Sequence, residues 1–102
     1  MVLPNKDEMP ETWLVKVYGR VQGVGYRNSS KQYALAQCIN GWVRNRQDGS
    51  VELMLQGTNE QLTNMCSWLR HGVPGARVDK LEVSAEHIPS LHFDIFDCLP
   101  TL

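Results

Sequence analysis

Two helical segments, each flanked by strand-like segments, constrain the fold of this chain more than any other feature. The clearer helical pattern is an apolar stripe at i, i+3, i+4 and i+7, formed by Leu62, Met65, Cys66 and Leu69. Thr58 and Gln61 form a possible capping box before this stripe, and Gly72 and Pro74 follow it as stop signals. The pattern therefore predicts a helix between residues 58 and 72.

The first helical segment is expected from Tyr26 to Gln37, where the chain contains neither glycine nor proline. Its stripe is weaker and has a four-residue spacing: Tyr26, Ser30, Ala34 and Cys38. The remaining segments alternate or are rich in β-branched and aromatic residues, which predicts strands at 13–18, 41–46, 51–55 and 78–85 and a short strand near Phe93 and Ile95. Asp48-Gly49 is a strong hairpin signal, and the alternation slips near Lys80, which suggests a bulge.

The resulting order, β-α-β-β-α-β, predicts the α+β class and a ferredoxin-like sandwich. An antiparallel sheet with both helices on one face is expected, and the final strand region is either one strand or two. We expect a folded domain over residues 12–98, a flexible N-terminal tail over 1–11 and a C-terminal tail over 99–102. At 102 residues the chain has room for a single such domain.

Composition narrows the range of functions. Lys and Arg total 10 against 11 Asp and Glu, a formal charge of −1, which argues against nucleic-acid binding driven by bulk charge. No apolar stretch approaches the roughly 20 residues of a membrane span. The N-terminus lacks a basic start followed by an apolar block, so we expect a cytoplasmic protein. We also expect a monomer without membrane or nucleic-acid partners.

Cysteine and histidine spacing indicates neither a disulfide framework nor a metal site. The residues concerned are Cys38, Cys66 and Cys98, and His71, His87 and His92. The cysteines are expected as free thiols, although one disulfide stays possible at this point. No metal and no cofactor is expected.

The segment between the first strand and the first helix is the most informative for function. It reads Gly-Arg-Val-Gln-Gly-Val-Gly-Tyr-Arg over residues 19–27. A glycine-rich loop leading into a helix can turn several backbone N–H groups toward one anion, and Arg27 can close such a cradle. The alternative is a tight connection in which the glycines only permit unusual backbone angles and Arg27 is solvated. Spacing alone does not separate these readings.

A second polar position is Asn45, at the end of the strand that precedes the hairpin. A polar side chain there either faces an active surface or bonds to the local backbone and shapes the turn. Taken alone, the turn-shaping role is the simpler reading.

Together the two segments closely resemble the acylphosphatase family. The resemblance rests on Gly-x-Val-Gln-Gly-Val-x-Tyr-Arg at 19–27 and on Gly-Trp-Val-x-Asn-x-x-Asp-Gly-x-Val-Glu at 41–52, with Gln56-Gly57 following in register. It covers roughly residues 12–97. It implies a ferredoxin-like enzyme that hydrolyses the carboxyl-phosphate bond of small acyl phosphates without a metal. In that family the arginine of the first motif binds the phosphoryl group and the asparagine of the second holds the attacking water, roles that fall on Arg27 and Asn45. The expected phosphate-binding residues are Gln22, Gly23, Val24, Gly25, Tyr26 and Arg27.

Three positions depart from the family pattern. Tyr26 stands where phenylalanine is common, so its hydroxyl needs a partner. Cys38 stands at a helix exit where glycine is favoured, because that position adopts a positive φ. Arg46 replaces a small polar residue and, with Arg44, is expected to widen the positive field around the site.

Two other functions compete with hydrolysis. One is a non-catalytic module on the same fold that binds phosphate or another anion. The other is an RNA-binding sheet, which needs exposed aromatic residues and a basic surface. With 8% aromatic residues and a net negative charge, the chain does not favour RNA binding.

Overall fold

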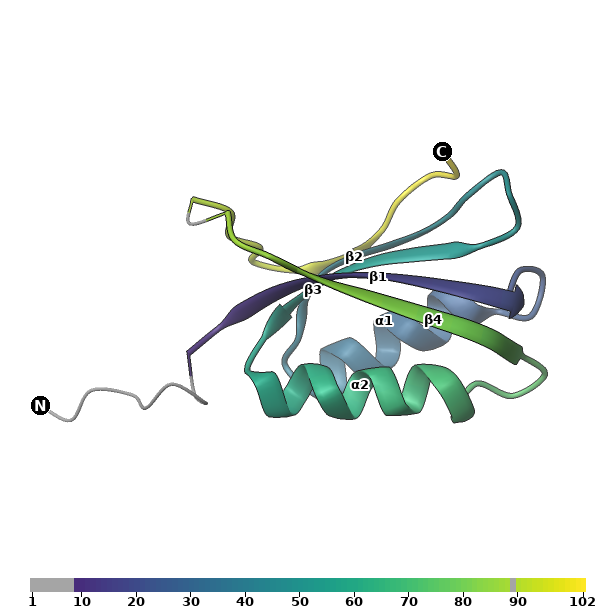
Figure 1. The fold of residues 1–102 in the computed structure, drawn as a ribbon, viewed down its shortest axis with the longest axis horizontal. Helices are drawn as coiled ribbons and strands as arrows, with labels where there is room; N and C mark the ends of the chain where they lie inside the picture. Colours follow the sequence, from purple (N-terminus) through teal and green to yellow (C-terminus); the bar gives the residue numbers. More distant parts are fainter. Residues whose placement is uncertain (1–8, 89) are drawn as a thin grey trace, which may run out of the picture.

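Five strands and two helices follow one another in the computed structural model, which describes residues 9–88 and 90–102 (Figure 1). In chain order they are β1 (Glu11–Arg20), α1 (Tyr26–Ala36), β2 (Asn40–Asn45), β3 (Val51–Gly57), α2 (Asn59–His71), β4 (Arg77–Glu86) and β5 (Phe96–Cys98). The expected order of elements is confirmed, and the final strand region consists of two strands.

The sheet has the order β4-β1-β3-β2-β5, and the three pairs formed by its first four strands are antiparallel. The expectation of a fully antiparallel sheet is wrong at one edge, where β5 runs parallel to β2. After β4, at the opposite edge, the chain crosses the sheet and arrives beside β2 in the same direction as that strand (Figure 1).

The last strand also lies later in the chain than the residues Phe93 and Ile95 had suggested. The amide of Phe93 donates to the side chain of Gln56 over 2.9 Å, and its carbonyl accepts from the side chain of Asn40, also over 2.9 Å. These bonds hold Phe93 in the connecting loop, so that β5 begins at Phe96.

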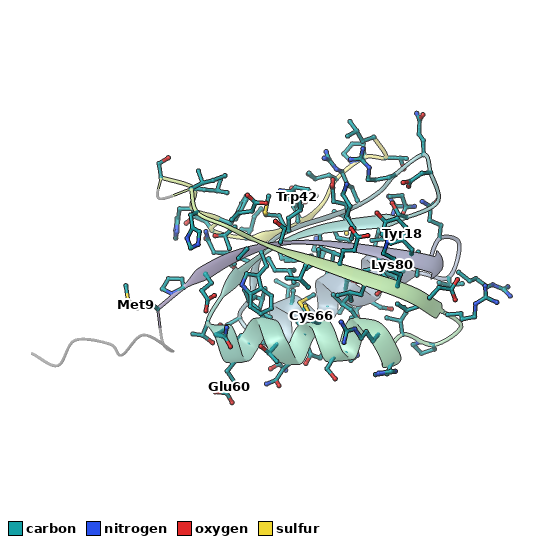
Figure 2. All side chains as sticks on the ribbon, in the orientation of Figure 1. Met9, Tyr18, Trp42, Glu60, Cys66 and Lys80 are labelled. Carbon is teal, nitrogen blue, oxygen red and sulfur yellow. The ribbon has the colours of Figure 1, made fainter. Side chains whose placement is uncertain are left out.

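Both helices cover one face of the sheet (Figure 1). Alternating strand residues, such as Val15 and Val17 on β1 and Leu53 on β3, point toward the helices and are fully buried. All four residues of the predicted α2 stripe are buried against them. Figure 2 shows Cys66 between α2 and the sheet, where burial raises the pKa of its thiol to about 11. The other face, which carries Trp42, has no helix over it (Figure 2).

An irregular pairing between β1 and β4 leads the chain into the loop before α1. Tyr18 pairs with Lys80, whereas the next residue, Gly19, pairs with Val78, so Asp79 is an extra residue on β4. This bulge lies beside the predicted position at Lys80. At Gly19 a β-carbon would meet the carbonyl oxygen of Arg77 at 2.1 Å, which explains why glycine is needed there.

The exit of α1 has the positive φ that the sequence predicted. Cys38 has a φ of 59°, and the amides of Cys38 and Ile39 donate to the carbonyls of Leu35 and Ala34 over 3.3 and 2.8 Å. This is the double hydrogen bond of a Schellman motif, in which glycine is the usual residue. The three cysteines are free thiols.

The two ends of the domain extend beyond the expected limits. Glu11, placed in the N-terminal tail by the sequence analysis, is the first residue of β1, while residues 1–8 of that tail lie outside the described part. At the other end the amides of Leu99 and Leu102 donate to the carbonyls of Val43 and Asn45 over 2.9 and 3.2 Å. The last residues therefore lie along β2.

Candidate active site

The loop before α1 and the hairpin between β2 and β3 lie at the same end of the sheet (Figure 1). Between them is a cavity of about 370 Å³. Its lining residues come from the loop, the first turn of α1, the end of β2 and the end of β5: Val21, Gln22, Gly23, Gly25, Tyr26, Arg27, Asn28, Asn45 and Cys98. The fold thus brings Arg27 and Asn45 to one cavity.

Free backbone amides surround the entrance of α1. Gly23 and Gly25 both adopt the left-handed region, with φ of 75° and 76°, and the first helical bond is the one from Ser29 N–H to the carbonyl of Gly25. Within the described chain, no N–H of residues 22–28 donates to another residue, and no side chain caps the helix. The first turn also contains no acidic residue. These donors and the positive end of the helix dipole can bind an anion.

The side chains of Arg27 and Asn45 are half-buried and available to a ligand. Neither forms a hydrogen bond or an ion pair with any other residue that the structure describes. A guanidinium presents a planar fork of donors that matches a phosphoryl group, whereas a carboxamide is neutral and can both donate and accept. The cavity therefore combines a cationic fork with a neutral polar group.

Gln22 connects the loop to the hairpin through its side chain. Its Nε2 donates to the carbonyls of Arg46 over 2.7 Å and Ser50 over 2.9 Å. Both hydrogens of the amide are thus used, and only the backbone N–H of Gln22 is left for a ligand. This connection spans 24 and 28 residues of chain, so no local pattern in the sequence could indicate it.

The side chains of Val24 and Tyr26 are engaged elsewhere, so only their backbone N–H groups are left for a ligand. Val24 does not line the cavity, and its side chain packs against the core. Tyr26 is buried, and its hydroxyl donates to the carbonyl of Leu69 in the last turn of α2 over 2.7 Å. Burial raises the pKa of this phenol, as does the nearby Cys66, so the hydroxyl stays a donor. The partner expected for the tyrosine hydroxyl is therefore in α2.

Arg44 and Arg46, which are expected to widen the positive field at the cavity, share one carboxylate as their partner, and the wider field stays a prediction. The two guanidiniums bind Glu52, at 2.7 and 3.2 Å from its Oε1. Residues alternate between the faces of a strand, so Arg44 lies on the face opposite to Asn45. The carboxylate compensates part of their charge.

Cys98 is a cavity residue that the sequence analysis did not select. Its Sγ lies 3.8 Å from the carbonyl oxygen of Arg27. The residue reaches the cavity because β5 pairs with β2 in parallel register, Cys98 opposite Val43. Only the sheet topology reveals this placement.

A larger hollow of about 540 Å³ lies at the other end of β1 and β3. Its acidic and basic side chains are those of Glu11, Glu86 and two histidines, with no Arg or Lys among the described lining residues. It is therefore less suited to a phosphate than the cavity at Arg27. Over residues 9–88 and 90–102 no group of three His, Cys, Asp or Glu side chains is placed to hold a metal ion, and no helix has the length and apolar character to cross a membrane.

The fold and the site define a small ferredoxin-like domain with a cradle for an anion beside a polar carboxamide. A sequence model of the family described as Acylphosphatase matches residues 13–97. The chain is 61% identical to the acylphosphatase of Polaromonas naphthalenivorans (strain CJ2) over 98 residues, which are 96% of this chain and 97% of that protein. The chain belongs to the acylphosphatase family.

Solved structures show the same relationship. The crystal structure of acylphosphatase from Bacillus subtilis matches with a TM-score of 0.81 and 31% identity, over 89% of this chain and 99% of that one. An acylphosphatase from Coxiella burnetii matches with a TM-score of 0.83 and 29% identity, over 88% and 93% of the two chains. Both similarities extend over nearly the whole domain.

Proposed function

We propose that this protein hydrolyses acyl phosphates, in which a carboxyl group and a phosphate form a mixed anhydride. Water attacks phosphorus, the bond between phosphorus and the carboxyl oxygen breaks, and a carboxylate and inorganic phosphate leave. Family membership supports this reaction class. The observation that carries the proposal is that the free loop amides, Arg27 and Asn45 all lie at the same cavity.

Phosphate binding is assigned to the loop and Arg27. Phosphoryl transfer depends on positioning and on stabilising charge at the equatorial oxygens of phosphorus. In this proposal the backbone N–H groups of residues 22–27 and the Arg27 guanidinium donate to those oxygens. Gln22 takes part through its backbone, while its side chain holds the loop against the hairpin.

Asn45 is assigned to the attacking water. A carboxamide orients water without repelling a phosphate dianion, as a carboxylate would. The leaving carboxylate has a conjugate acid with a pKa of about 4, so it departs as a stable anion and needs no general acid. The proton of the water passes to an oxygen of the substrate's own phosphoryl group. No metal or cofactor takes part.

The functional unit in this proposal is a monomer of the domain over residues 12–98. It works in the cytoplasm on small molecules and without nucleic acid. Gel filtration and fractionation test the assembly and the location separately from the reaction.

The reaction is tested by hydrolysis of benzoyl phosphate in the presence of EDTA, comparing the parent protein with Asn45→Ala. We expect steady turnover by the parent and a loss of roughly 100-fold in kcat for Asn45→Ala, with inhibition by inorganic phosphate retained. Asn64→Ala, on the exposed surface of α2, is the matched control and keeps the parent rate.

Two results would contradict the proposal. Hydrolysis by Asn45→Ala at the parent rate would remove the role of Asn45. Phosphate binding by the parent without turnover of benzoyl phosphate would instead indicate the non-catalytic anion-binding module.

A further inference from the structure

Glu52 is a charged residue whose burial the proposed reaction does not explain. Its 4% exposure makes it the one buried charged side chain in the described part of the chain. It lies on the face of the sheet that no helix covers, in a row where Glu82, Lys16, Glu52 and Arg44 are paired across four neighbouring strands. Charge alternates along this row, and it ends at the strand that carries Asn45.

The carboxylate of Glu52 binds two guanidiniums through one oxygen. Its Oε1 accepts from Arg44 Nε over 2.8 Å and lies 2.7 Å from Arg44 Nη2, and Arg46 Nη1 donates to the same oxygen over 3.2 Å. The other oxygen faces Lys16 Nζ at 3.9 Å. A buried carboxylate is costly unless it is paired and hydrogen-bonded, and these contacts meet that requirement.

The two arginines are the residues immediately before and after Asn45. Because side chains alternate along a strand, both arginines point to the open face while Asn45 points to the cavity. We propose that Glu52 is a positioning residue for Asn45: by holding both flanking side chains it fixes the backbone of residues 44–46 and so the direction of the carboxamide. The inference rests on the proposed role of Asn45.

Arg46 contributes both its side chain and its backbone to this arrangement. Arg46 follows the last pair of the β2–β3 ladder, Asn45 opposite Val51; its N–H donates to the carbonyl of Ser50 over 2.9 Å, and its carbonyl accepts from the amide of Gly49 over 3.1 Å. In addition its side chain is held by Glu52, and its carbonyl also accepts from the side chain of Gln22. The backbone just after Asn45 is therefore fixed from the open face and from the phosphate loop at once.

The experiment compares Glu52→Gln with the parent in benzoyl phosphate hydrolysis. The amide keeps the shape of the side chain and removes its charge. We expect kcat to fall roughly 10-fold, because small displacements of a catalytic group have large effects on rate. The inhibition constant for inorganic phosphate stays within about 2-fold, because the loop amides and Arg27 are not touched. Glu82→Gln, in the same row but with two strands between it and β2, is the matched control and keeps the parent kcat.

A double-mutant cycle decides whether Glu52 acts through Asn45. Glu52→Gln is introduced into Asn45→Ala, and the rate is measured in a single turnover with enzyme in excess. If Glu52 positions Asn45, the second change has no further effect on the rate. A further 10-fold loss in this background would overturn the positioning role, because it would show that the charge acts independently of the carboxamide.

The outcomes separate this inference from the proposed reaction. A slow Asn45→Ala together with a Glu52→Gln that turns over at the parent rate refutes the positioning role alone. An Asn45→Ala at the parent rate refutes the role of Asn45, and the positioning role with it.

A second variant covers the case in which Glu52→Gln does not fold. Arg46→Met removes one of the two flanking contacts at a half-buried position, and its main-chain bonds are retained. We expect a fall of about 3-fold to 10-fold in kcat at constant phosphate inhibition, largely restored in Arg46→Lys, which can still reach the carboxylate. Equal rates for the parent and Arg46→Met would contradict the proposal.

Discussion

The N-termini of the two helices differ in how their free amides are used. At α2 the hydroxyl of Thr58 accepts from the amide of Gln61, and the Gln61 side chain accepts from the amide of Thr58. Glu60 adds a negative charge in the first turn and points to solvent (Figure 2). At α1 the cap is Gly25, without a side-chain bond and without an acid. The first-turn amides of α2 are therefore used within the helix cap, whereas the corresponding amides of α1 are left for a ligand.

The C-termini differ in the opposite sense. The chain leaves α1 through Cys38 at a positive φ of 59°, the conformation that favours glycine. It leaves α2 at Gly72, where φ is −96°, and glycine is needed for another reason: a β-carbon would lie 2.2 Å from the ring of Trp68. Only the structure distinguishes these two needs. The comparison shows that the N-terminus of α2 is stabilised by its cap, whereas α1 has an uncapped N-terminus and a strained residue at its C-terminus.

The largest expected effect is that of Arg27→Ala, which removes the cation of the α1 entrance. The side chain of Arg27 pairs with no other described residue, so we expect the free energy of unfolding to change by less than about 0.5 kcal/mol. Loss of a donor to the transition state lowers kcat/KM by roughly 100-fold to 1000-fold. Benzoyl phosphate kinetics and urea unfolding measure the two quantities. A large loss of stability would mean that Arg27 is structural.

A smaller effect is expected when α1 receives the acid that α2 already has. Asn28→Asp places a carboxylate in the first turn, which stabilises the helix by about 0.3–1 kcal/mol. The same charge repels a phosphate dianion, so KM and the phosphate inhibition constant rise by about 10-fold. The matched control is Asn28→Gln, which adds no charge and leaves the kinetics unchanged. A stabilised Asn28→Asp with parent kinetics would place the phosphate away from this helix end.

Removing the cap of α2 is expected to affect stability alone. Thr58→Ala leaves the amide of Gln61 without its acceptor and lowers the free energy of unfolding by about 1 kcal/mol. The site lies at α1, so kcat/KM is unchanged. Thr63→Ala, on the exposed side of α2, is the control in the urea titration. A lower kcat/KM for Thr58→Ala under conditions in which the variant is fully folded would contradict the prediction that the cap of α2 affects stability alone.

The smallest effect is expected at the exit of α1. Cys38→Gly removes the strain of a β-carbon in the left-handed region, and the greater freedom of glycine in the unfolded chain offsets part of the gain. We expect a net stabilisation of about 0.5 kcal/mol by thermal unfolding. Cys38→Ala keeps the β-carbon and brings no gain; if it stabilises equally, the thiol and not the φ is the cause.

Local signals allowed much of the fold to be predicted. The α2 stripe, the Thr58–Gln61 capping box and the Asp48-Gly49 turn depend on neighbours a few residues apart, and the structure contains all three. The parallel pairing of β5 with β2 was missed, because it depends on which edge of the sheet the chain reaches after β4. The hydrogen bonds between the Gln56 side chain and the loop before β5 were missed for the same reason, because they join residues that are far apart in the sequence.

In the candidate site, too, the features that depend on neighbouring residues were predicted, and those that depend on distant residues were not. The residue types and spacing around Arg27 and Asn45 indicated the family, because the phosphate loop and the hairpin are each continuous stretches of chain. The partners of these residues are distant: Gln22 reaches the hairpin, and Cys98 arrives on β5. Glu52 lies near in sequence, but its burial and its two arginine partners depend on the pairing of β2 with β3.

Periodicity, turn residues and motif spacing sufficed for the order of the elements and for the family, because each arises from contacts within a few residues. Tertiary structure alone decided which amides stay free, which arginines pair with Glu52, and that Arg27 and Asn45 share one cavity. The physical reason is that hydrogen bonding and burial depend on every group within contact distance. Those groups are brought together only when the sheet closes over the helices.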